Sequence, residues 1–462
     1  MISSGAVAST SAARIDLGNL SDEEEAVLEA EIAARRAARR SRRRKHYADT
    51  DDEDDHVQIG TRVAEGHRNY QLMYDMLTGI RIAVGRVSAK MRRDPNPDDF
   101  TAAHKLVFDV TGNELTPGVK YDFKFKDYAP WVFRNLREIF HIDAADYLMS
   151  LTHKYILSEL GSPGKSGSFF YYSRDYRFII KTIHRSEHVF MRKILMDYYD
   201  HVRRNPNTLL CRIYGLHRIK LPRGRKIHFV VMGNVFPSNK NVHETYDLKG
   251  STFGRLTTDD EINKNPYAVM KDLNWIKRKK KLELGPEKRN LFLTQLQKDV
   301  AVLTKLNIMD YSLLIGIHGI EKGNDERYRD QHLQLIETRG LGLERQLSKQ
   351  QKFKPVKKYT TNPIPLVATS QLATNPSEER RHCIFYADNG GFQSSDRHDQ
   401  DSDLLYFIGV IDILTPYNFM KKSEHIWKSI TQDKNTISSV PPKVYGQRFL
   451  EFMENAVRNH HF

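Results

Sequence analysis

The sequence predicts an α+β fold in two lobes. Strand-like and helix-like runs alternate from about residue 61 onward, and 39% of the 462 residues are hydrophobic, which is enough to bury a large core. We expect a small β-rich lobe with attached helices over residues 61–232. A mixed α/β lobe is expected over residues 233–457.

Residues 1–60 are predicted to form a disordered, charged tail. The basic run Arg35–Lys45 is followed directly by the acidic stretch Asp49–Asp55. Such charge runs are usually solvated, and a nuclear import signal or a tether to anionic membrane is the alternative. A nucleic-acid arm would need a recognition module, which this sequence does not offer, so no specific nucleic acid is expected.

Hydrophobic periodicity places the elements of the first lobe. Apolar residues at helical spacing predict helices over His67–Val84, Ala129–Phe140, Ala144–Leu160 and Glu187–Arg203. Runs rich in β-branched and aromatic residues predict strands over Ser168–Ser173, Tyr176–Ile183, Leu209–Ile219 and Lys226–Met232.

The second lobe is predicted to contain a buried helix, Asn290–Leu306, and two strands, Ser312–His318 and Leu405–Leu414. The segment Arg339–Asp403 between these strands is rich in Lys, Gln, Ser, Thr, Asn and Pro. It is too polar to build a core and too long for an ordinary loop, so we predict a mostly disordered insert over about 339–403.

Charge and cysteine content indicate the kind of partner and the cellular compartment to expect. A formal net charge of +14 favours a polyanionic partner, which charge alone leaves open among nucleic acid, acidic membrane and a phosphorylated substrate. The two cysteines, Cys211 and Cys383, lie far apart, as in proteins of reducing compartments. With no apolar run of about 20 residues and no secretory signal at the N-terminus, a cytoplasmic or nuclear location is expected.

A glycine- and serine-rich turn joins two predicted strands in SPGKSGSFFYYSRDYRFIIKTI, residues 162–183. A Walker loop would need a glycine at Glu159 and a following helix, and neither is present. In kinase-like phosphotransfer a glycine loop covers the phosphates and a strand lysine neutralises them, a place that Lys181 could take. A hairpin with an exposed lysine is the structural alternative.

The stretch TYDLKGSTFGR, residues 245–255, interleaves charged residues with glycine and serine. Such a backbone can hold an anion while Lys249 and Arg255 contact phosphate. A purely structural turn has little use for two cations flanking two glycines, so an anion site is favoured.

Two aspartates stand beside apolar strands. Asp310 lies where a helix gives way to a strand, a position from which a carboxylate can orient a substrate hydroxyl or hold Mg²⁺. Asp412 interrupts the apolar run FIGVIDIL, where an acid is costly unless it is paired or metal-bound. A structural ion pair with a buried arginine is the alternative. The strings HRD and DFG of protein kinases are absent.

These motifs together resemble those of the phosphatidylinositol phosphate kinases. They occur in the family's order between about residues 61 and 457, and the phrases SPGKSGSFFYYSRDY and YDFKFKDYAPWVFRNLR are most similar to fungal members. The matching segments are Gly164–Ser168, Ile179–Thr182, Tyr246–Thr252, Met309–Leu314 and Ile411–Asp412.

The resemblance implies a two-lobed fold distantly similar to protein kinases, with an antiparallel sheet in the first lobe and a flattened basic face that docks on membrane. It implies ATP and Mg²⁺ as cofactors, with Asp412 as the metal ligand. Lys181, Asp310 and Asp412 would be catalytic. Nucleotide contacts would come from Gly164, Ser166, Gly167, Ser168, Lys181, Met232 and Asn234. Gly233 and Val235 depart from the family's usual spelling beside the adenine contacts.

Substrate contacts implied by the resemblance are Asp247, Lys249, Arg255, Lys421, Lys422 and Glu424. Type I members carry glutamate where type II members have alanine, so Glu424 points to phosphorylation of phosphatidylinositol 4-phosphate at the 5 position. Ile426 and Trp427 could enter the membrane interface beside the two lysines.

Three other functions remain open at this stage. They are a phosphatidylinositol-5-phosphate 4-kinase, a protein kinase, and a phosphoinositide-binding scaffold without activity. The expected partners are the lipid substrate and an anionic membrane surface at the inner face of the plasma membrane, and the resemblance implies a homodimer paired through the small lobe.

Overall fold

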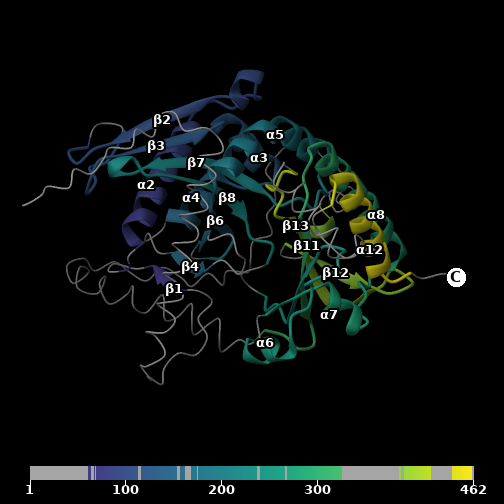
Figure 1. Cartoon of the computed structure of the whole chain (residues 1–462). Helices are drawn as coiled ribbons and strands as arrows, with labels where there is room; N and C mark the ends of the chain where they lie inside the picture. Colours follow the sequence, from purple (N-terminus) through teal and green to yellow (C-terminus); the bar gives the residue numbers. More distant parts are fainter. Residues whose placement is uncertain are drawn as a thin grey trace, which may run out of the picture. The chain divides into compact units, whose positions relative to one another are not determined.

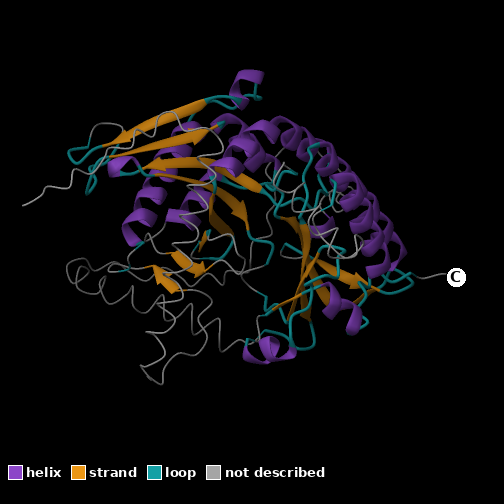
Figure 2. Cartoon of the chain, in the orientation of Figure 1, coloured by secondary structure: helices purple, strands orange, loops and turns teal. Residues whose placement is uncertain are grey.

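Two β-sheets organise the chain (Figure 2). The computed structural model describes residues 61–63, 67, 69–112, 116–152, 157–161, 168–173, 175–236, 240–265, 268–324, 384–386, 390–417 and 440–459. Within these residues one sheet has eight strands and the other has five. The predicted α+β class is confirmed. The predicted tail lies outside the described residues.

The eight-stranded sheet is antiparallel throughout, with the order β1-β4-β5-β6-β8-β7-β3-β2. Its strands are β1 (Thr61–Val63), β2 (Ala103–Phe108), β3 (Phe123–Tyr128), β4 (Leu157–Gly161), β5 (Phe169–Tyr172), β6 (Phe178–Ile183), β7 (Ile213–Lys220) and β8 (Lys226–Gly233). In β3 the buried Phe123 and Phe125 alternate with exposed or half-buried lysines, the period-2 pattern of a sheet with one covered face.

Helices pack on this sheet and on one another. They are α2 (Tyr70–Ser88), α3 (Pro130–Ile139), α4 (Ala144–Thr152) and α5 (Arg185–Arg204), with the short η1 (Pro97–Phe100) and η3 (Pro222–Gly224). Gly79 lets α2 approach the sheet closely, because a Cβ there would lie 2.1 Å from the Phe125 ring. At the start of α5 the Glu187 carboxylate accepts a hydrogen bond from the His184 N–H at 2.7 Å, which caps the helix.

The five-stranded sheet has the order β10-β9-β11-β13-β12, with β10 parallel to β9 and the other pairs antiparallel. Its strands are β9 (Glu244–Leu248), β10 (Val269–Met270), β11 (Ser312–Gly319), β12 (Phe392–Ser395) and β13 (Asp401–Ile411). The helices that follow in this part are α6 (Asp259–Lys264), α7 (Asp272–Lys277), α8 (Gly285–Lys305), η4 (Ile384–Tyr386) and α12 (Pro442–Ala456). Helices α8 and α12 lie against each other (Figure 1).

One prediction is wrong, and a second is wrong for the part of its segment that the structure describes. The helix expected over Ala144–Leu160 ends at Thr152, and Leu157–Gly161 is strand β4 between β1 and β5. The insert expected over 339–403 includes β12 and the start of β13, because Phe392 is buried against Tyr406 on the neighbouring strand. Strands β2 and β3 and helix α12 were not predicted. No described helix is long and apolar enough to span a membrane.

Two neighbouring histidines should make the stability of the fold depend on pH. Burial, then the charges of His228 and Arg192, lowers the pKa of His188 to about 3, and burial with Arg218 lowers that of His228 to about 4. In an unfolded chain both would become protonated below about pH 6.5. Since the unfolded state then binds more protons, the free energy of unfolding should fall as pH drops from about 6.5 toward 4. His188→Gln should flatten this slope in urea unfolding.

The exposed His104 provides a matched control for this test. His104→Gln should leave the pH dependence as it is in the parent protein. An equal slope in the His188→Gln protein would contradict the assignment.

Candidate functional site

Three strands of the smaller sheet bring charged residues to one end. Ser312 of β11 pairs with Ile411 of β13, and Leu313 pairs with Leu248 of β9. Because these pairs are antiparallel, β11 begins at the edge of the sheet where β9 and β13 end. The residues before β11 and after β9 and β13 therefore meet at this edge. Asp310 precedes β11, Asp412 follows β13 and Lys249 follows β9, so all three lie at that edge.

Both aspartates have an unusual backbone. The φ angle is +61° at Asp310 and +61° at Asp412, in the left-handed region that few residues other than glycine adopt. Aspartate tolerates this region better than most residues, yet it remains costly, and such conformations concentrate at functional sites. Each aspartate therefore turns sharply out of its strand at the edge where the three strands end.

Lys181 reaches this edge from the larger sheet. Its Nζ lies 3.1 Å from Asp412 Oδ1, which joins β6 to the end of β13. The Lys181 side chain is 15% exposed, that of Asp412 is 45% exposed, and the ammonium lies over the Phe170 ring. Burial works against the charge of Lys181, but Asp412 and Glu187 outweigh it and raise the pKa of the lysine. The lysine is therefore charged at neutral pH.

The segment that enters β7 is attached to β13 close to Asp412. The Cys211 N–H donates to the Val410 carbonyl at 2.8 Å, and the Val410 N–H donates to the Leu209 carbonyl at 2.6 Å. Val410 is two residues before Asp412. The same segment thus connects the larger sheet directly to the strand that carries the metal-ligand candidate.

Asp299 of α8 fixes that segment from behind. Its fully buried carboxylate accepts hydrogen bonds from the Thr208 hydroxyl at 2.7 Å and the Leu209 N–H at 2.8 Å. The Gln295 amide donates to it at 2.8 Å, and the His201 ring nitrogen lies 2.6 Å away. One carboxylate therefore holds α5, α8 and the entry to β7 together.

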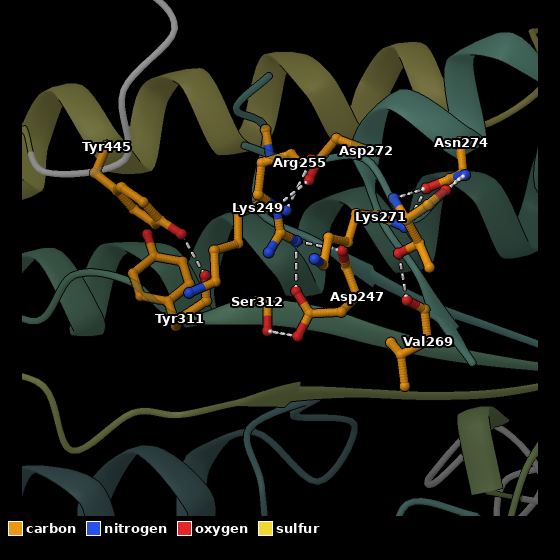
Figure 3. A network of polar contacts seen from close by, with 12 residues as sticks. Asp247, Lys249, Arg255, Val269, Lys271, Asp272, Asn274, Tyr311, Ser312 and Tyr445 are labelled. Carbon is orange, nitrogen blue, oxygen red and sulfur yellow. Dashed lines mark hydrogen bonds and ion pairs between the residues drawn. The ribbon is translucent and has the colours of Figure 1, made fainter. Parts of the chain in front are cut away.

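The turn after β9 contains a polar network (Figure 3). Arg255 donates to Asp272 at 2.7 Å and to the Asp247 carboxylate at 2.6 Å. The Ser312 hydroxyl donates to the other Asp247 oxygen at 3.0 Å. Asp247 and Arg255 are thus engaged with each other, whereas Lys249 is half-buried and forms no ion pair among the described residues.

Helix α12 supports the segment that contains Asp310. The Tyr445 hydroxyl donates to the Tyr311 carbonyl, next to Asp310, and the two rings pack edge to face. Sequence reasoning missed Tyr445, Asp272 and Asp299. Asp299 could have been found, because it is an isolated acid on an apolar helix face, the same signal that singled out Asp412.

Among the remaining candidates for nucleotide contact, the structure describes Met232, Asn234 and Ser168. Met232 lies near the end of β8, opposite Ile179 of β6. Asn234 donates through its side chain to the Tyr176 carbonyl at 2.8 Å and accepts from the Phe236 N–H at 3.2 Å, so it shapes the turn after β8. Ser168 is buried directly before β5. Gly164, Ser166, Gly167, Lys421, Lys422 and Glu424 lie outside the described residues.

The donors at the strand ends suit Mg²⁺. This ion is usually held by one or two carboxylates, while waters and substrate phosphates complete its shell. Asp412 is exposed enough to serve, and Asp310 lies at the same edge. Among the described residues, no three or more His, Cys, Asp or Glu side chains are clustered so that they could hold a metal ion. A site completed by substrate phosphates does not need such a cluster.

Comparison with known proteins gives a consistent result. A family model described as phosphatidylinositol-4-phosphate 5-kinase matches residues 151–456. Phosphatidylinositol 4-phosphate 5-kinase its3 of Schizosaccharomyces pombe is 53% identical over 414 residues, which cover 88% of this chain and 56% of that protein.

Plant proteins match over a similar extent. Phosphatidylinositol 4-phosphate 5-kinase 9 of Arabidopsis thaliana is 36% identical, covering 86% of this chain and 52% of the relative. Phosphatidylinositol 4-phosphate 5-kinase 1 of Oryza sativa is 36% identical, covering 85% and 54%. The chain therefore spans little more than half the length of these relatives.

Removal of the Asp299 carboxylate should destabilise the fold strongly. Asp299→Ala leaves the Thr208 hydroxyl and the Leu209 N–H buried without their acceptor, so we expect the free energy of unfolding to fall by about 3 kcal/mol. Urea unfolding of the purified variant measures this loss. Glu287→Ala, at an exposed acid of the same helix, is the control. A loss of less than roughly 1 kcal/mol in Asp299→Ala would be too small for such a network.

Proposed function

Since the chain belongs to the phosphatidylinositol-4-phosphate 5-kinase family, we propose that it transfers the γ-phosphate of ATP to the 5-hydroxyl of phosphatidylinositol 4-phosphate. One observation carries the proposal. Lys181 and Asp412, from different sheets, lie in direct contact at the edge where Asp310 and Lys249 also lie. A phosphate donor at this edge would meet a cation, a metal-ligand candidate and a candidate base together.

The proposed mechanism is direct in-line transfer. Lys181 would leave Asp412 to neutralise phosphate oxygens of ATP, and Asp310 would orient the inositol hydroxyl and accept its proton. Mg²⁺, when bound through Asp412, supplies charge neutralisation for the phosphates. Catalysis by these residues would consist of positioning and electrostatic stabilisation, with no covalent enzyme intermediate.

The choice of the 5-hydroxyl is supported by two independent arguments. The relatives from fission yeast, Arabidopsis and rice all carry the name phosphatidylinositol 4-phosphate 5-kinase. Glu424, in the type I-like segment after Asp412, is the sequence feature that separates the two specificities. A 5-phosphate 4-kinase is the competing specificity.

We also propose that the enzyme works on an anionic membrane surface. On one face of the larger sheet, which α5 covers at the His228 end, Lys105, Lys126, Arg218 and His228 are cross-strand neighbours in one row. Val107, Lys124, Lys220 and Lys226 form the adjacent row, two residues along each strand. We call Lys105, Lys124, Lys126, Arg218, Lys220 and Lys226 the basic face.

The basic face is electrostatically strained. Burial, then the charges of Arg218, Lys105, Arg192 and Lys226, lowers the pKa of Lys126. Like charges directly opposite on neighbouring strands destabilise a sheet, and no acid interrupts either row. Val107, within the second row, is 51% exposed. A negatively charged lipid surface would relieve the repulsion and cover the valine. Location at the plasma membrane and pairing into a homodimer stay predictions.

Transfer of radiolabelled phosphate tests the function. The protein is incubated with labelled ATP, Mg²⁺ and vesicles containing either phosphatidylinositol 4-phosphate or phosphatidylinositol 5-phosphate, and the labelled position is determined. We expect label at the 5 position of the first lipid. Lys181→Met and Asp412→Asn should each lower the rate by at least about a thousandfold, because each removes a charge that acts on the transferred phosphate.

Lys298→Met, at an exposed lysine of α8, is the control and should keep full activity. Circular dichroism and thermal unfolding establish that the inactive variants are folded. Normal turnover by either site variant would refute the assignment, and label at the 4 position of the second lipid would establish the competing specificity.

Neutralising part of the basic face should weaken membrane binding. Lys124→Gln combined with Lys220→Gln removes two opposed cations, each worth roughly 1 kcal/mol near an anionic surface, so binding should fall about thirtyfold. Co-sedimentation with phosphatidylserine-containing vesicles measures this. The pair Lys298→Gln and Lys305→Gln on α8 is the matched control. Unchanged co-sedimentation of the first variant would argue against docking through this face.

A further inference from the structure

Asp310 lies between two fixed points of the main chain, one before it and one after it. The point after it is held by Tyr445 of α12. We propose that Tyr445 is a positioning residue for phosphate transfer, because its hydroxyl holds the Tyr311 main chain and thereby keeps the Asp310 carboxylate directed at the substrate hydroxyl. This role rests on the proposed function and adds a residue to it.

The backbone of Asp310 needs such support. Its φ angle of +61° lies in the left-handed region, where a side chain remains only if the surrounding structure prevents relaxation. Relaxation to the right-handed or the extended region would change the direction in which the Asp310 carboxylate leaves the main chain. The contacts made by the two neighbours of Asp310 therefore determine where its carboxylate points.

The residues before Asp310 pair with the segment that follows the second aspartate of the site. The Met309 N–H donates to the Thr415 carbonyl at 3.1 Å, and the Tyr417 N–H donates to the Asn307 carbonyl at 2.8 Å. Both bonds join main-chain atoms, and they fix the chain as far as Met309. They do not constrain the peptide that follows Asp310.

The residue after Asp310 is held by α12. The Tyr445 hydroxyl donates to the Tyr311 carbonyl, a contact that Figure 3 shows. The Tyr311 ring packs edge to face against Tyr445 and Phe449, with 4.8 and 5.1 Å between ring centroids. All three side chains are fully buried. Both the ring and the carbonyl of Tyr311 are thus fixed, and with them the peptide that leaves Asp310.

Helix α12 packs closely on α8 directly beside Tyr445. Gly446 is the next residue, and a Cβ there would lie 2.8 Å from Val300 Cγ1 and 2.9 Å from Thr304 Oγ1 of α8. Helix α8 leads into the segment that contains Asp310. The same helix therefore supports Tyr445 and carries the chain to Asp310, so the two residues have a common rigid base.

The Tyr445 hydroxyl remains a hydrogen-bond donor. Burial, and then the negative charge of Asp310, raises the pKa of Tyr445 well above the usual value for tyrosine. The phenol therefore stays protonated at neutral pH. Loss of the hydroxyl would leave the buried Tyr311 carbonyl without this donor, which favours a turn of its peptide and relaxation of the strained residue before it.

Steady-state kinetics of Tyr445→Phe on the full chain test this role, since the substitution removes one hydroxyl and keeps the ring. We expect kcat to fall at least about tenfold, because a small displacement of a positioned group slows the chemical step. The KM values for ATP and for a short-chain, soluble phosphatidylinositol 4-phosphate should change less than about twofold. Asp310→Asn should lower kcat by itself, and in that background Tyr445→Phe should have almost no further effect.

Tyr199→Phe is the matched control. The buried Tyr199 of α5 donates through its hydroxyl to Asn135 Oδ1 of α3 at 2.7 Å, so the same chemical change removes a buried hydrogen bond between two helices on the larger sheet. This variant should keep the parent kcat. Urea unfolding of both variants measures their losses of stability, so that an effect on kcat can be separated from general destabilisation.

Three results would overturn the proposal. They are an unchanged kcat in Tyr445→Phe, an equal fall of kcat in Tyr199→Phe, and multiplicative effects of Tyr445→Phe and Asp310→Asn. If the parent protein phosphorylates no lipid, the proposed function itself fails, a result distinct from an active parent in which Tyr445→Phe is neutral.

Phe449→Leu gives a second test that applies even if Tyr445→Phe does not fold. It loosens the Tyr311 ring from its other side and leaves the hydroxyl contact in place. If α12 acts through the main chain at Asp310, kcat should fall with both KM values unchanged, and the effect should disappear in the Asp310→Asn background. An effect that persists there would mean that α12 acts on another group, and the proposal is wrong.

Discussion

Contact between Lys181 and Asp412 is the constraint on which the site depends. The two residues are 231 positions apart in the sequence and come from different sheets. Their 3.1 Å separation therefore requires that the two sheets keep the same relation, that is the same relative position, at this edge. The attachment of Leu209 and Cys211 to Val410 supplies that relation, and Asp299 fixes the attached segment. A salt bridge with one partner 45% exposed adds little stability by itself. Buried hydrogen bonds behind the pair therefore maintain the geometry.

Local patterns predicted much of the fold. Strands β6, β8 and β11 follow apolar runs, and α5 follows helical periodicity with its first-turn glutamate and last-turn arginines. Asp412 was found because an acid in an apolar strand needs a partner, although that partner is Lys181 and not an arginine. Leu157–Gly161 and Phe392–Ser395 could not be recognised in this way, since the runs LSELG and FQSS are short and mostly polar, although each pairs with the next strand along the chain. Asp272 gains its role from a turn 22 residues earlier.

Two of the costs in this structure lie at the proposed functional surfaces, although left-handed backbone also occurs elsewhere, for example at Tyr176 and Lys279. Asp310 and Asp412 adopt left-handed backbone, and the basic face aligns like charges on adjacent strands. Other charges are arranged favourably, as at Arg177, which binds both Asp146 and Asp175. Selection for stability alone would remove strained backbone and like-charge rows. Their retention at an edge and on one face is consistent with ligands that carry negative charge.

Lys249 and Arg255 illustrate why residue type alone does not assign a role. Both belong to one motif, and from sequence both were expected to contact phosphate. Arginine, with a planar guanidinium, can satisfy two carboxylates at once and tolerates burial when it does so. Lysine keeps a single flexible charge at the end of an apolar stem. In this structure Asp272 and Asp247 pair with the arginine inside the turn, whereas Lys249 forms no ion pair among the described residues. The two cations of one motif therefore have different electrostatic surroundings, which their residue types alone do not predict.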